Sequence, residues 1–470
     1  MKNKCLLIMG VMLPLLLGEG CFMDILQSEI SNSQTQVKFT TYSVKNPLAE
    51  VTHISVVFPF SASTDPTEKQ GLTTIAVDML LKGSREFNSR QISERLALYG
   101  ASVQMIVGRF YTVLQINVLS EYLEPCLKFL TVLMRTPTFP KSEFQLLKDQ
   151  YISDIKTTLE SNKKMLWRAY QRWYYAAEPL NHLTGGTLQT LNAITLEDVR
   201  AWWKNSFGAS ELKVFISSNL PEPDVVGLLQ RYFSWVKPVP TPPSPTAQMV
   251  YQPKGIEVVL VDKKDTQTND FMFAQPSMSF AVDKQQYYAN YLANTAFGSG
   301  MQSRLFVELR EKRGWTYHAS SGYWSSFYWD IPVPWVIYSF PSLQYTAQAI
   351  PMAYQMLKDY LAKGLTSEEI QLYRTNMIRS YPFTVDTPHK LLDKIFDEVV
   401  QGRYKLDQKE REALLLGITH SKILSSLKNG HTTQDLVFLV VGDAQKIQPQ
   451  LSKWFKSIPK VRVIRPEDVL

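Results

Sequence analysis

The sequence has few of the residues that form disulfides or bind metal ions in small domains. It contains 3 cysteines and 6 histidines in 470 residues. Cys5 lies in the apolar N-terminal segment, which leaves Cys21 and Cys126, so no disulfide framework exists. The histidines are His53, His182, His318, His389, His420 and His431. Since no two of them lie three or four residues apart, no helix face presents a pair of imidazole ligands.

The N-terminal apolar run is too short to cross a membrane. It extends from Cys5 to Leu17, which is about 20 Å of helix against a hydrocarbon core of roughly 30 Å. Because Lys2 and Lys4 precede it, we expect an export signal over residues 1–20, with a buried core helix as the alternative.

The end of the predicted signal leaves two fates open. Gly18 and Gly20 stand at the −3 and −1 positions of a cleavage before Cys21, which could also carry lipid, whereas Glu19 is unusual in a lipoprotein signal. We therefore expect an exported chain that is periplasmic or a membrane-anchored lipoprotein facing the periplasm.

Charge of one sign is not concentrated anywhere. The chain has 50 Lys and Arg against 43 Asp and Glu, for a formal net charge of +7, and removal of the signal lowers this to about +6. Basic residues are spread out and no nucleic-acid motif accompanies them. We therefore expect no nucleic-acid partner.

The length and the prolines predict two domains. A single core rarely grows beyond about 300 residues. Prolines interrupt the segment KPVPTPPSPTAQ at Pro238, Pro240, Pro242, Pro243 and Pro245. Such a run favours an extended spacer. We predict a linker over 237–252 between an N-terminal domain, 37–236, and a C-terminal domain, 253–470.

The two predicted domains repeat a pattern. Each ends in a Thr-capped helix, an apolar strand, and an amphipathic helix that ends in aromatic residues. The caps are Thr195 and Thr419 and the strands are Leu212–Ile216 and Leu436–Val441. The repeat interval of about 224 residues indicates a domain duplication.

The signals at the start of the first domain predict the fold. Strands are expected over Val51–Phe60 and over two runs within Ser102–Leu119 that join near Gly108, and helices over Gly71–Leu81 and Ser89–Tyr99. Strands that follow one another closely favour antiparallel pairing. We predict an α+β fold of two duplicated domains, each a mainly antiparallel sheet covered by helices.

The segment from Ala49 to Gln104 resembles the N-terminal domain of the pitrilysin and insulinase family, which includes mitochondrial processing peptidase. Active members carry His-x-x-Glu-His and then Met-Leu-x-Lys-Gly-Thr/Ser on one helix. The flanking residues are kept here as Gly71, Leu72, Met79, Leu80, Lys82, Gly83 and Ser84. The resemblance implies the insulinase-like fold for nearly all of the predicted mature chain.

The zinc motif itself is lost. Thr74 stands at the first His position, Val77 at the Glu position and Asp78 at the second His position, while the family's downstream Glu falls on Asp154. Catalytic zinc needs three protein ligands, an open water position and a nearby base. We expect no zinc in this chain. Asp78 and Asp154 could hold a hard cation, but two carboxylates bridged by a hydroxyl or a Lys are favoured.

The stretch FGSGMQSRLFVELREKRGWTYHASSGYW resembles the family's C-terminal segment, in which an Arg and a Tyr seven residues apart bind the substrate carbonyl and the oxyanion. Arg310 and Tyr317 have this spacing. Donors aimed at a developing oxyanion are commonly worth about 3 to 4 kcal/mol each. The resemblance implies that these two residues are catalytic.

Structural interpretations stand beside this one. Arg310 could be a solvated cation at a helix end that Gly314 terminates, and Tyr317 a strand aromatic packed on Trp315 or Tyr323. The same alternatives apply to the Gly-rich turn before the helix. Its residues Gly298, Ser299 and Gly300 are candidate substrate contacts by resemblance, or a loop capped at Ser303; no P-loop spacing follows.

The resemblance implies a non-metal subunit of a heterodimeric metallopeptidase. Its partner would be a homologous subunit with an intact zinc motif, and the pair would cut an extended peptide, while this chain alone would be inactive. A catalytically silent peptide-binding or scaffold protein of the same fold is the alternative. A single-chain peptidase with unusual ligands would contain zinc when purified.

Overall fold

The structure is a computed structural model that describes residues 25–31, 37–175, 178–243, 251–277, 283–323, 331–400, 408–455 and 460–470. The predicted export signal, Cys21 and part of the predicted linker lie outside these ranges. Within them, no helix combines the length and the apolar character needed to cross a membrane.

The chain forms two compact units that differ from the two halves of the sequence. Unit 1 comprises residues 1–153, 182–244 and 383–400, and unit 2 comprises 154–181, 245–382 and 401–470. The longest segment of unit 2 begins after residue 244, within the Pro-rich segment. The boundaries predicted from the sequence do not include the exchange of 154–181 and 383–400.

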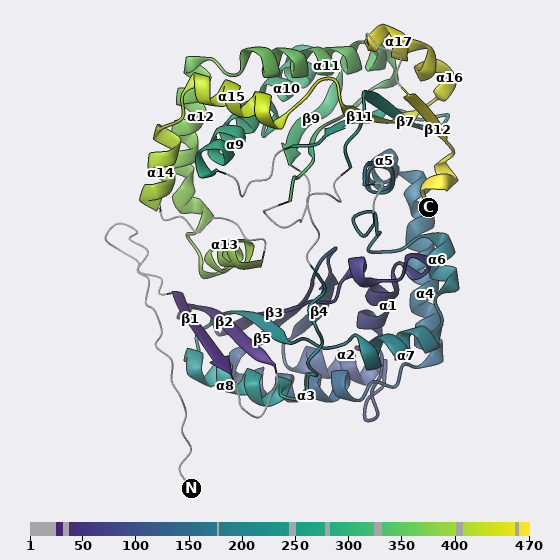
Figure 1. Ribbon diagram of the computed structural model, residues 1–470. Helices are drawn as coiled ribbons and strands as arrows, with labels where there is room; N and C mark the ends of the chain where they lie inside the picture. The colour runs from purple at the N-terminus through teal and green to yellow at the C-terminus, as the bar shows by residue number, and fades with distance from the viewer. Residues whose placement is uncertain are drawn as a thin grey trace. The chain divides into compact units, whose positions relative to one another are not determined.

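Unit 1 is built on a six-stranded sheet of order β1-β2-β6-β3-β5-β4. Its strands are β1 (Ile25–Ser31), β2 (Lys38–Lys45), β3 (Val51–Phe58), β4 (Ser102–Val107), β5 (Thr112–Leu119) and β6 (Glu211–Ser218). Its helices are α1 (Leu72–Met79), α2 (Ser89–Leu98), α3 (Leu123–Arg135), α4 (Lys141–Lys156, which runs into unit 2), α6 (Leu188–Ala193), α7 (Leu196–Asn205), α8 (Glu222–Phe233) and α13 (Pro388–Val400). Figure 1 shows α2, α3 and α8 along one face of this sheet.

Unit 2 is built on a second six-stranded sheet of order β12-β7-β11-β8-β10-β9. Its strands are β7 (Ile256–Asp262), β8 (Asp270–Gln275), β9 (Thr316–Tyr323), β10 (Trp335–Pro341), β11 (Leu436–Gly442) and β12 (Lys460–Ile464). Its helices are α5 (Asn162–Ala169), α9 (Lys284–Gly298), α10 (Arg304–Phe306), α11 (Thr346–Lys363), α12 (Ser367–Ser380), α14 (Gln408–Leu416), α15 (His420–Gly430), α16 (Ala444–Ile447) and α17 (Leu451–Trp454). Two π-helical segments follow α5 and α10, namely η5 (Tyr170–Tyr174) and η7 (Val307–Lys312).

The two sheets repeat one topology over five strands. β2 pairs parallel with β6 as β7 does with β11, and the next three strands on that side are antiparallel in both sheets. The sixth strand differs, because β1 is antiparallel to β2 whereas β12 is parallel to β7. The predicted α+β fold with two duplicated, mainly antiparallel sheets is confirmed.

Each unit receives one helix from the other half of the sequence. α13 packs on β2 and β6 of unit 1, where Phe396 contacts Phe215 with ring centroids 4.9 Å apart. α5 packs on β7, β8 and β11 of unit 2. The sequence analysis placed helices on the sheets but did not predict this exchange.

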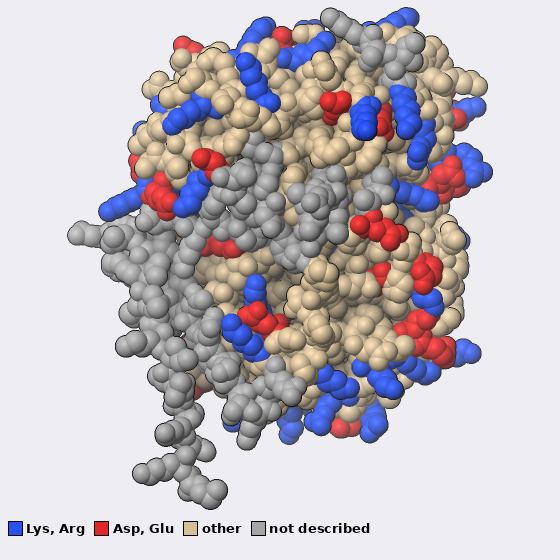
Figure 2. All heavy atoms as spheres, in the orientation of Figure 1, with Lys and Arg blue, Asp and Glu red and all other residues tan. Residues whose placement is uncertain are grey.

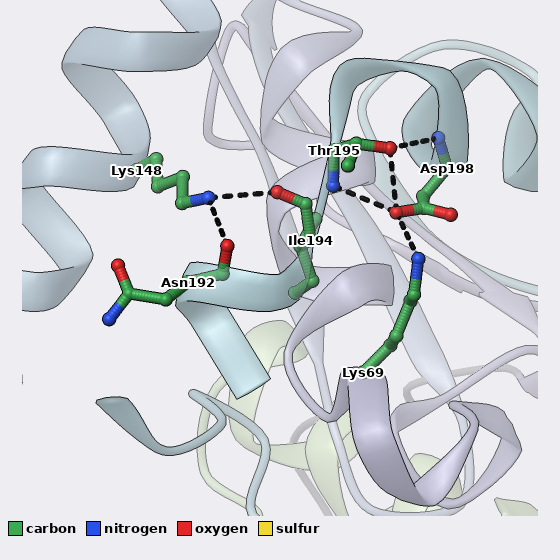
Figure 3. Close-up of polar contacts among 6 residues, drawn as sticks. All are labelled: Lys69, Lys148, Asn192, Ile194, Thr195 and Asp198. Carbon is green, nitrogen blue, oxygen red and sulfur yellow. Dashed lines mark hydrogen bonds and ion pairs between the residues drawn. The ribbon is translucent and has the colours of Figure 1, made fainter. Parts of the chain in front are cut away.

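The predicted threonine caps are present. The Thr195 side chain accepts from the backbone N–H of Asp198, and Thr419 does the same for Lys422. Around the first cap, the Asp198 carboxylate accepts from the Thr195 N–H at 2.8 Å and also pairs with Lys69. Figure 3 shows this cap together with Lys148, whose ammonium donates to the carbonyl of Ile194 at 2.8 Å. The start of α7 is thus held by ions of both signs.

Surface charge is mixed. Figure 2 shows basic and acidic side chains interspersed over the visible face. Several exposed pairs are local, such as Arg90 with Glu94 and Lys390 with Asp386, each four residues apart on the chain. Exposed pairs of this kind contribute little to stability.

His431 is a half-buried histidine that follows the last residue of α15. Its ring contacts Trp335 edge-on at 5.1 Å, its Nε2 lies 3.4 Å from the Tyr323 hydroxyl, and its buried Nδ1 has no hydrogen-bond partner among the described residues. Burial lowers the pKa of His431 to about 4, so the ring is neutral at pH 7.

We expect acid to destabilise unit 2 through His431. The unfolded chain, with a histidine pKa near 6.5, binds more protons than the folded chain between pH 6.5 and pH 4. The stability is therefore complete above about pH 6.5, and about 3 kcal/mol is lost as the pH falls to 4. Urea denaturation across this range should show a flatter pH dependence for His431→Phe, whereas His420→Phe, at an exposed histidine of the same unit, should behave like the wild type.

Candidate functional site

The helix with the altered zinc motif is anchored at its start. α1 begins after Gly71, whose φ of +95° favours glycine. The Asp65 carboxylate accepts from the backbone N–H of Gly71 at 2.9 Å and from that of Thr73 at 3.0 Å. Burial raises the pKa of Asp65 to about 6, although these hydrogen bonds act in the opposite direction. The Gly-Leu pair, which resembles that of the family, therefore stabilises the start of the helix.

Thr74 and Val77, at two of the zinc-motif positions, make contacts that stabilise the fold. The Thr74 hydroxyl donates to the carbonyl of Thr184 at 2.6 Å. Val77 is completely buried in the apolar core of unit 1. A valine offers neither a ligand atom nor a base, so the chemistry of the motif has no support at these positions.

The third position, Asp78, is held by Tyr151. The tyrosine hydroxyl of α4 donates to the Asp78 carboxylate. Burial raises the pKa of Asp78, while this hydrogen bond and the charge of Lys82 oppose the rise. The Tyr151 hydroxyl thus contacts one carboxylate of the expected bridged pair. The other expected carboxylate, Asp154, is exposed on α4.

No cluster of three or more His, Cys, Asp or Glu side chains suited to a metal ion occurs in the part of the chain that the structure describes. The side chains at positions 74, 77 and 78 do not fit a zinc ion, because only Asp78 offers a usual ligand and its carboxylate already accepts from Tyr151.

We predict that Tyr151→Phe destabilises unit 1 more at pH 7 than at pH 4. An ionised carboxylate that loses a buried donor costs about 1.5 to 3 kcal/mol, whereas a protonated Asp78 depends less on that donor. Urea denaturation at both pH values tests this. Equal losses at the two pH values would contradict the role given to Tyr151. Tyr99→Phe is the control, since the Tyr99 ring stacks on Tyr122 and its hydroxyl contacts no carboxylate in the described chain.

Arg310 stacks between two aromatic rings. It lies in the π-helical segment η7, with its guanidinium carbon 4.7 Å from the centroid of Phe306 and 4.4 Å from that of Tyr317. Among the described residues it has no ion pair or hydrogen bond through its guanidinium. The stack fixes the plane of the guanidinium, while its N–H donors stay uncommitted.

Tyr317 lies on β9, the terminal strand of the second sheet, which pairs only with β10 in the described chain. Its side chain is 73% exposed, and its hydroxyl has no partner among the described residues. The structure therefore brings both predicted catalytic residues together, and their donors bind no other residue in the part of the chain that the structure describes.

The structural interpretations account for only part of this arrangement. Gly314, with φ of +64°, follows the helix, and its N–H donates to the Arg310 carbonyl at 2.9 Å, so Arg310 does lie near a helix end. However, the Trp315 ring contacts the guanidinium of Arg313 at 4.8 Å, and Tyr317 is stacked by Arg310.

The Gly-rich segment is divided between a helix and a turn. Gly298 is the buried last residue of α9, and a Cβ there would lie 2.4 Å from the backbone nitrogen of Ser321 on β9. Ser299 and Gly300 form the exposed turn, where Gly300 has φ of +97°. Ser303 follows as N-cap of α10, and its hydroxyl donates to the Gly300 carbonyl at 2.7 Å. Gly298 thus lets α9 approach β9 closely.

Sequence reasoning missed the residue that ties β9 to α9. The Asn294 side-chain oxygen accepts from the Ser321 hydroxyl at 2.8 Å and from the Trp335 indole N–H at 2.7 Å. Asn294 is buried in the apolar face of α9. A polar residue among apolar helix neighbours was the available signal, because a buried amide must find partners.

His318 was also missed as a neighbour of the site. Its Nε2 lies 2.9 Å from the Ser320 hydroxyl. Because side chains alternate along a strand, His318 and Ser320 lie on the face of β9 opposite to Tyr317. Burial, then the charges of Lys163 and Arg310, lower the pKa of His318. The imidazole is therefore neutral at pH 7.

We predict that Gly298→Ala displaces β9 and destabilises unit 2 by about 1 to 3 kcal/mol, because the new methyl group overlaps backbone atoms. Gly227→Ala is the control: Gly227 lies within α8, and a Cβ there meets nothing within 4 Å, so helix propensity should make this variant slightly more stable. Thermal unfolding measures both. A neutral Gly298→Ala would show that α9 and β9 do not need this close approach.

The comparisons with known sequences agree with this geometry. Residues 40–187 match the insulinase family (peptidase family M16), and residues 193–377 match the peptidase M16 inactive domain. Since the two matches together cover most of the chain, this protein belongs to the M16 peptidase family and has its N-terminal and C-terminal (inactive) domains.

Curated relatives are distant. The chain is 20% identical over 451 residues to the non-peptidase homolog YmxG of Helicobacter pylori, covering 91% of this chain and 97% of that protein. It is 22% identical over 292 residues to an uncharacterized zinc protease of Rickettsia felis, covering 62% of this chain and 69% of the relative. It is also 18% identical over 212 residues to the mitochondrial-processing peptidase subunit beta of Neurospora crassa, covering 43% and 44%.

Solved structures share the fold. A peptidase M16 inactive domain from Pseudomonas fluorescens superposes with a TM-score of 0.77 at 17% identity, covering 92% of this chain and 99% of that one. A protease from Helicobacter pylori gives a TM-score of 0.76 at 14% identity, covering 88% and 99%. At these identities the likeness establishes the insulinase-like fold and nothing finer.

Proposed function

We propose that this chain is the non-zinc subunit of a heterodimeric M16 metallopeptidase. It contributes Arg310 and Tyr317 to the transition state and part of the wall around a bound peptide, and a homologous subunit with an intact zinc motif supplies the metal. The observation that carries the proposal is the Arg310–Tyr317 stack at 4.4 Å, in which neither side chain donates a hydrogen bond to another described residue.

The chemistry of amide hydrolysis explains why these residue types would be kept. Attack on an amide carbonyl places negative charge on its oxygen, and preorganised donors aimed at that oxygen lower the barrier. Arg310 has a permanent charge on a plane fixed by Phe306 and Tyr317. The Tyr317 hydroxyl adds a directional donor. When bound in the partner, zinc would activate the attacking water.

The strand that bears Tyr317 also suits an extended peptide. β9 is a terminal strand, and terminal strands offer backbone N–H and carbonyl groups to a further strand. β4 holds the same place in the first sheet. A peptide added beside such a strand would bring a backbone carbonyl near Tyr317.

The names of the relatives support both parts of the proposal. One relative, matched over nearly the whole chain, is called a non-peptidase homolog. This name agrees with the presence of Thr74, Val77 and Asp78 at the motif positions of the zinc ligands and the base. Another is called a subunit of a processing peptidase, which favours action in a pair. We further propose that the protein is exported, with Cys21 as the place of a lipid anchor if it has one.

We predict that the chain alone cleaves no peptide and that activity needs a co-expressed M16 subunit with an intact zinc motif. In the pair, Arg310→Ala should lower kcat about 10² to 10³-fold and Tyr317→Phe should lower it in the same direction, because each removes a transition-state donor. Steady-state cleavage of a quenched fluorescent peptide measures both.

Arg379→Ala is the matched control, since Arg379 is an exposed arginine of α12 in the same unit, and it should leave the activity of the pair unchanged. Elemental analysis should find zinc in proportion to the partner and none in the isolated chain. Stoichiometric zinc together with full activity in the isolated chain would overturn the proposal.

A silent peptide-holding or scaffold protein of the same fold is the second candidate, favoured by the name of the non-peptidase relative. A scaffold would keep its function with Arg310→Ala and Tyr317→Phe as long as it folds. If the pair cleaves peptides equally well with both variants, this second candidate is the correct one.

A further inference from the structure

Unit 2 contains a second candidate site, away from Arg310 and Tyr317. A cavity of about 450 Å³ opens where β7 and β12 begin, a volume within the range of small-ligand pockets. β12 and β9 are the two edges of the sheet, five strand spacings apart, so the cavity lies roughly 24 Å from the strand of Tyr317. The two sites are therefore distinct.

Three basic side chains line this cavity: Arg172, Lys460 and Arg462. Arg172 is oriented by its surroundings, since its guanidinium carbon lies 5.1 Å from the centroid of Trp173 and its Nη1 donates to the Asp468 carbonyl at 2.8 Å. Lys460 and Arg462 are exposed and have no ion pair within the described residues. None of the three cations forms an ion pair within the described residues, although Arg172, after Arg465, helps to lower the pKa of Asp468.

The carboxylate among the lining residues is Glu257, which is held by a neutral donor. The Tyr251 hydroxyl donates to it at 2.7 Å. Burial, followed by this carboxylate, raises the pKa of Tyr251 to about 12, so the hydroxyl keeps its proton. Lys460 lies directly across from Glu257 in the register of β12 and β7, yet no ion pair joins them. The described lining thus has a formal charge of +2.

We propose that this cavity binds a compact dianion of the phosphate class. A phosphate group with a charge near −2 balances the lining, and its oxygens can accept from several cations at once, whereas a single carboxylate would leave positive charge uncompensated. Arginine is suited to such groups because its planar fork can donate two hydrogen bonds to one phosphate. The phosphate can belong to a soluble phosphate monoester or to a lipid headgroup that ends in a phosphate monoester.

Isothermal titration calorimetry of the full chain with inorganic phosphate at pH 7.5 tests the site. We expect saturable binding at one site, which Lys460→Gln together with Arg462→Gln should weaken at least about 10-fold, since contacts to charged groups are worth that much or more. Lys428→Gln is the control, because Lys428 is an exposed lysine of α15 that does not line the cavity. Circular dichroism establishes that all variants fold.

Co-sedimentation with vesicles separates the two sources of phosphate. Vesicles of phosphatidylcholine with phosphatidic acid, a phosphomonoester lipid, are compared with vesicles of phosphatidylcholine alone. Binding of inorganic phosphate without vesicle binding assigns a soluble phosphate ester, and vesicle binding that the double variant loses assigns a lipid headgroup. The inference fails if neither probe binds saturably. It also fails if the double variant binds as well as the wild type and the control Lys428→Gln.

Discussion

The hydrogen bonds to one buried oxygen determine the position of the candidate site. The Asn294 side chain accepts from Ser321 of β9 and from Trp335 of β10. An unpaired amide in this apolar core would cost several kcal/mol, so both strands are fixed against α9. Gly298 allows the close approach one helical turn later. The place of Tyr317, and with it the stack with Arg310, follows from this contact.

The helix of the lost zinc motif has kept its fold for reasons separate from metal binding. Asp65 anchors its start, Thr74 ties it to Thr184, and Val77 fills the core. Each of the three motif positions on this helix, Thr74, Val77 and Asp78, makes a contact suited to its own side chain. Such contacts replace the stabilisation that a bound ion would give to a helix in this place.

Much of the fold could be predicted from the sequence because local patterns carry it. The strand β3, the helix α2 and the caps at Thr195 and Thr419 follow alternation, periodicity and side-chain capping, which need only neighbouring residues. The exchange of α5 and α13 could not be predicted, because it depends on which sheet each apolar helix face meets, and periodicity does not contain this information.

The candidate site was predictable to a similar extent. The seven-residue spacing of Arg310 and Tyr317 identified both as candidate catalytic residues, and the structure places them in contact. Gly298 was expected in a turn and lies in a helix, because a helix may end on a glycine that packs against a strand. Asn294, His318 and the basic cavity were missed, since each depends on residues distant in the sequence.

The exchanged helices bear on how this chain can be synthesised and divided. The first sheet receives α13 only after residue 400 has been made, so the parts of β2 and β6 that α13 covers stay exposed while most of the chain is still being translated. A cut in the Pro-rich segment would likewise leave α5 and α13 attached to the wrong fragments. Two halves related by duplication have in this way become dependent on each other for completion.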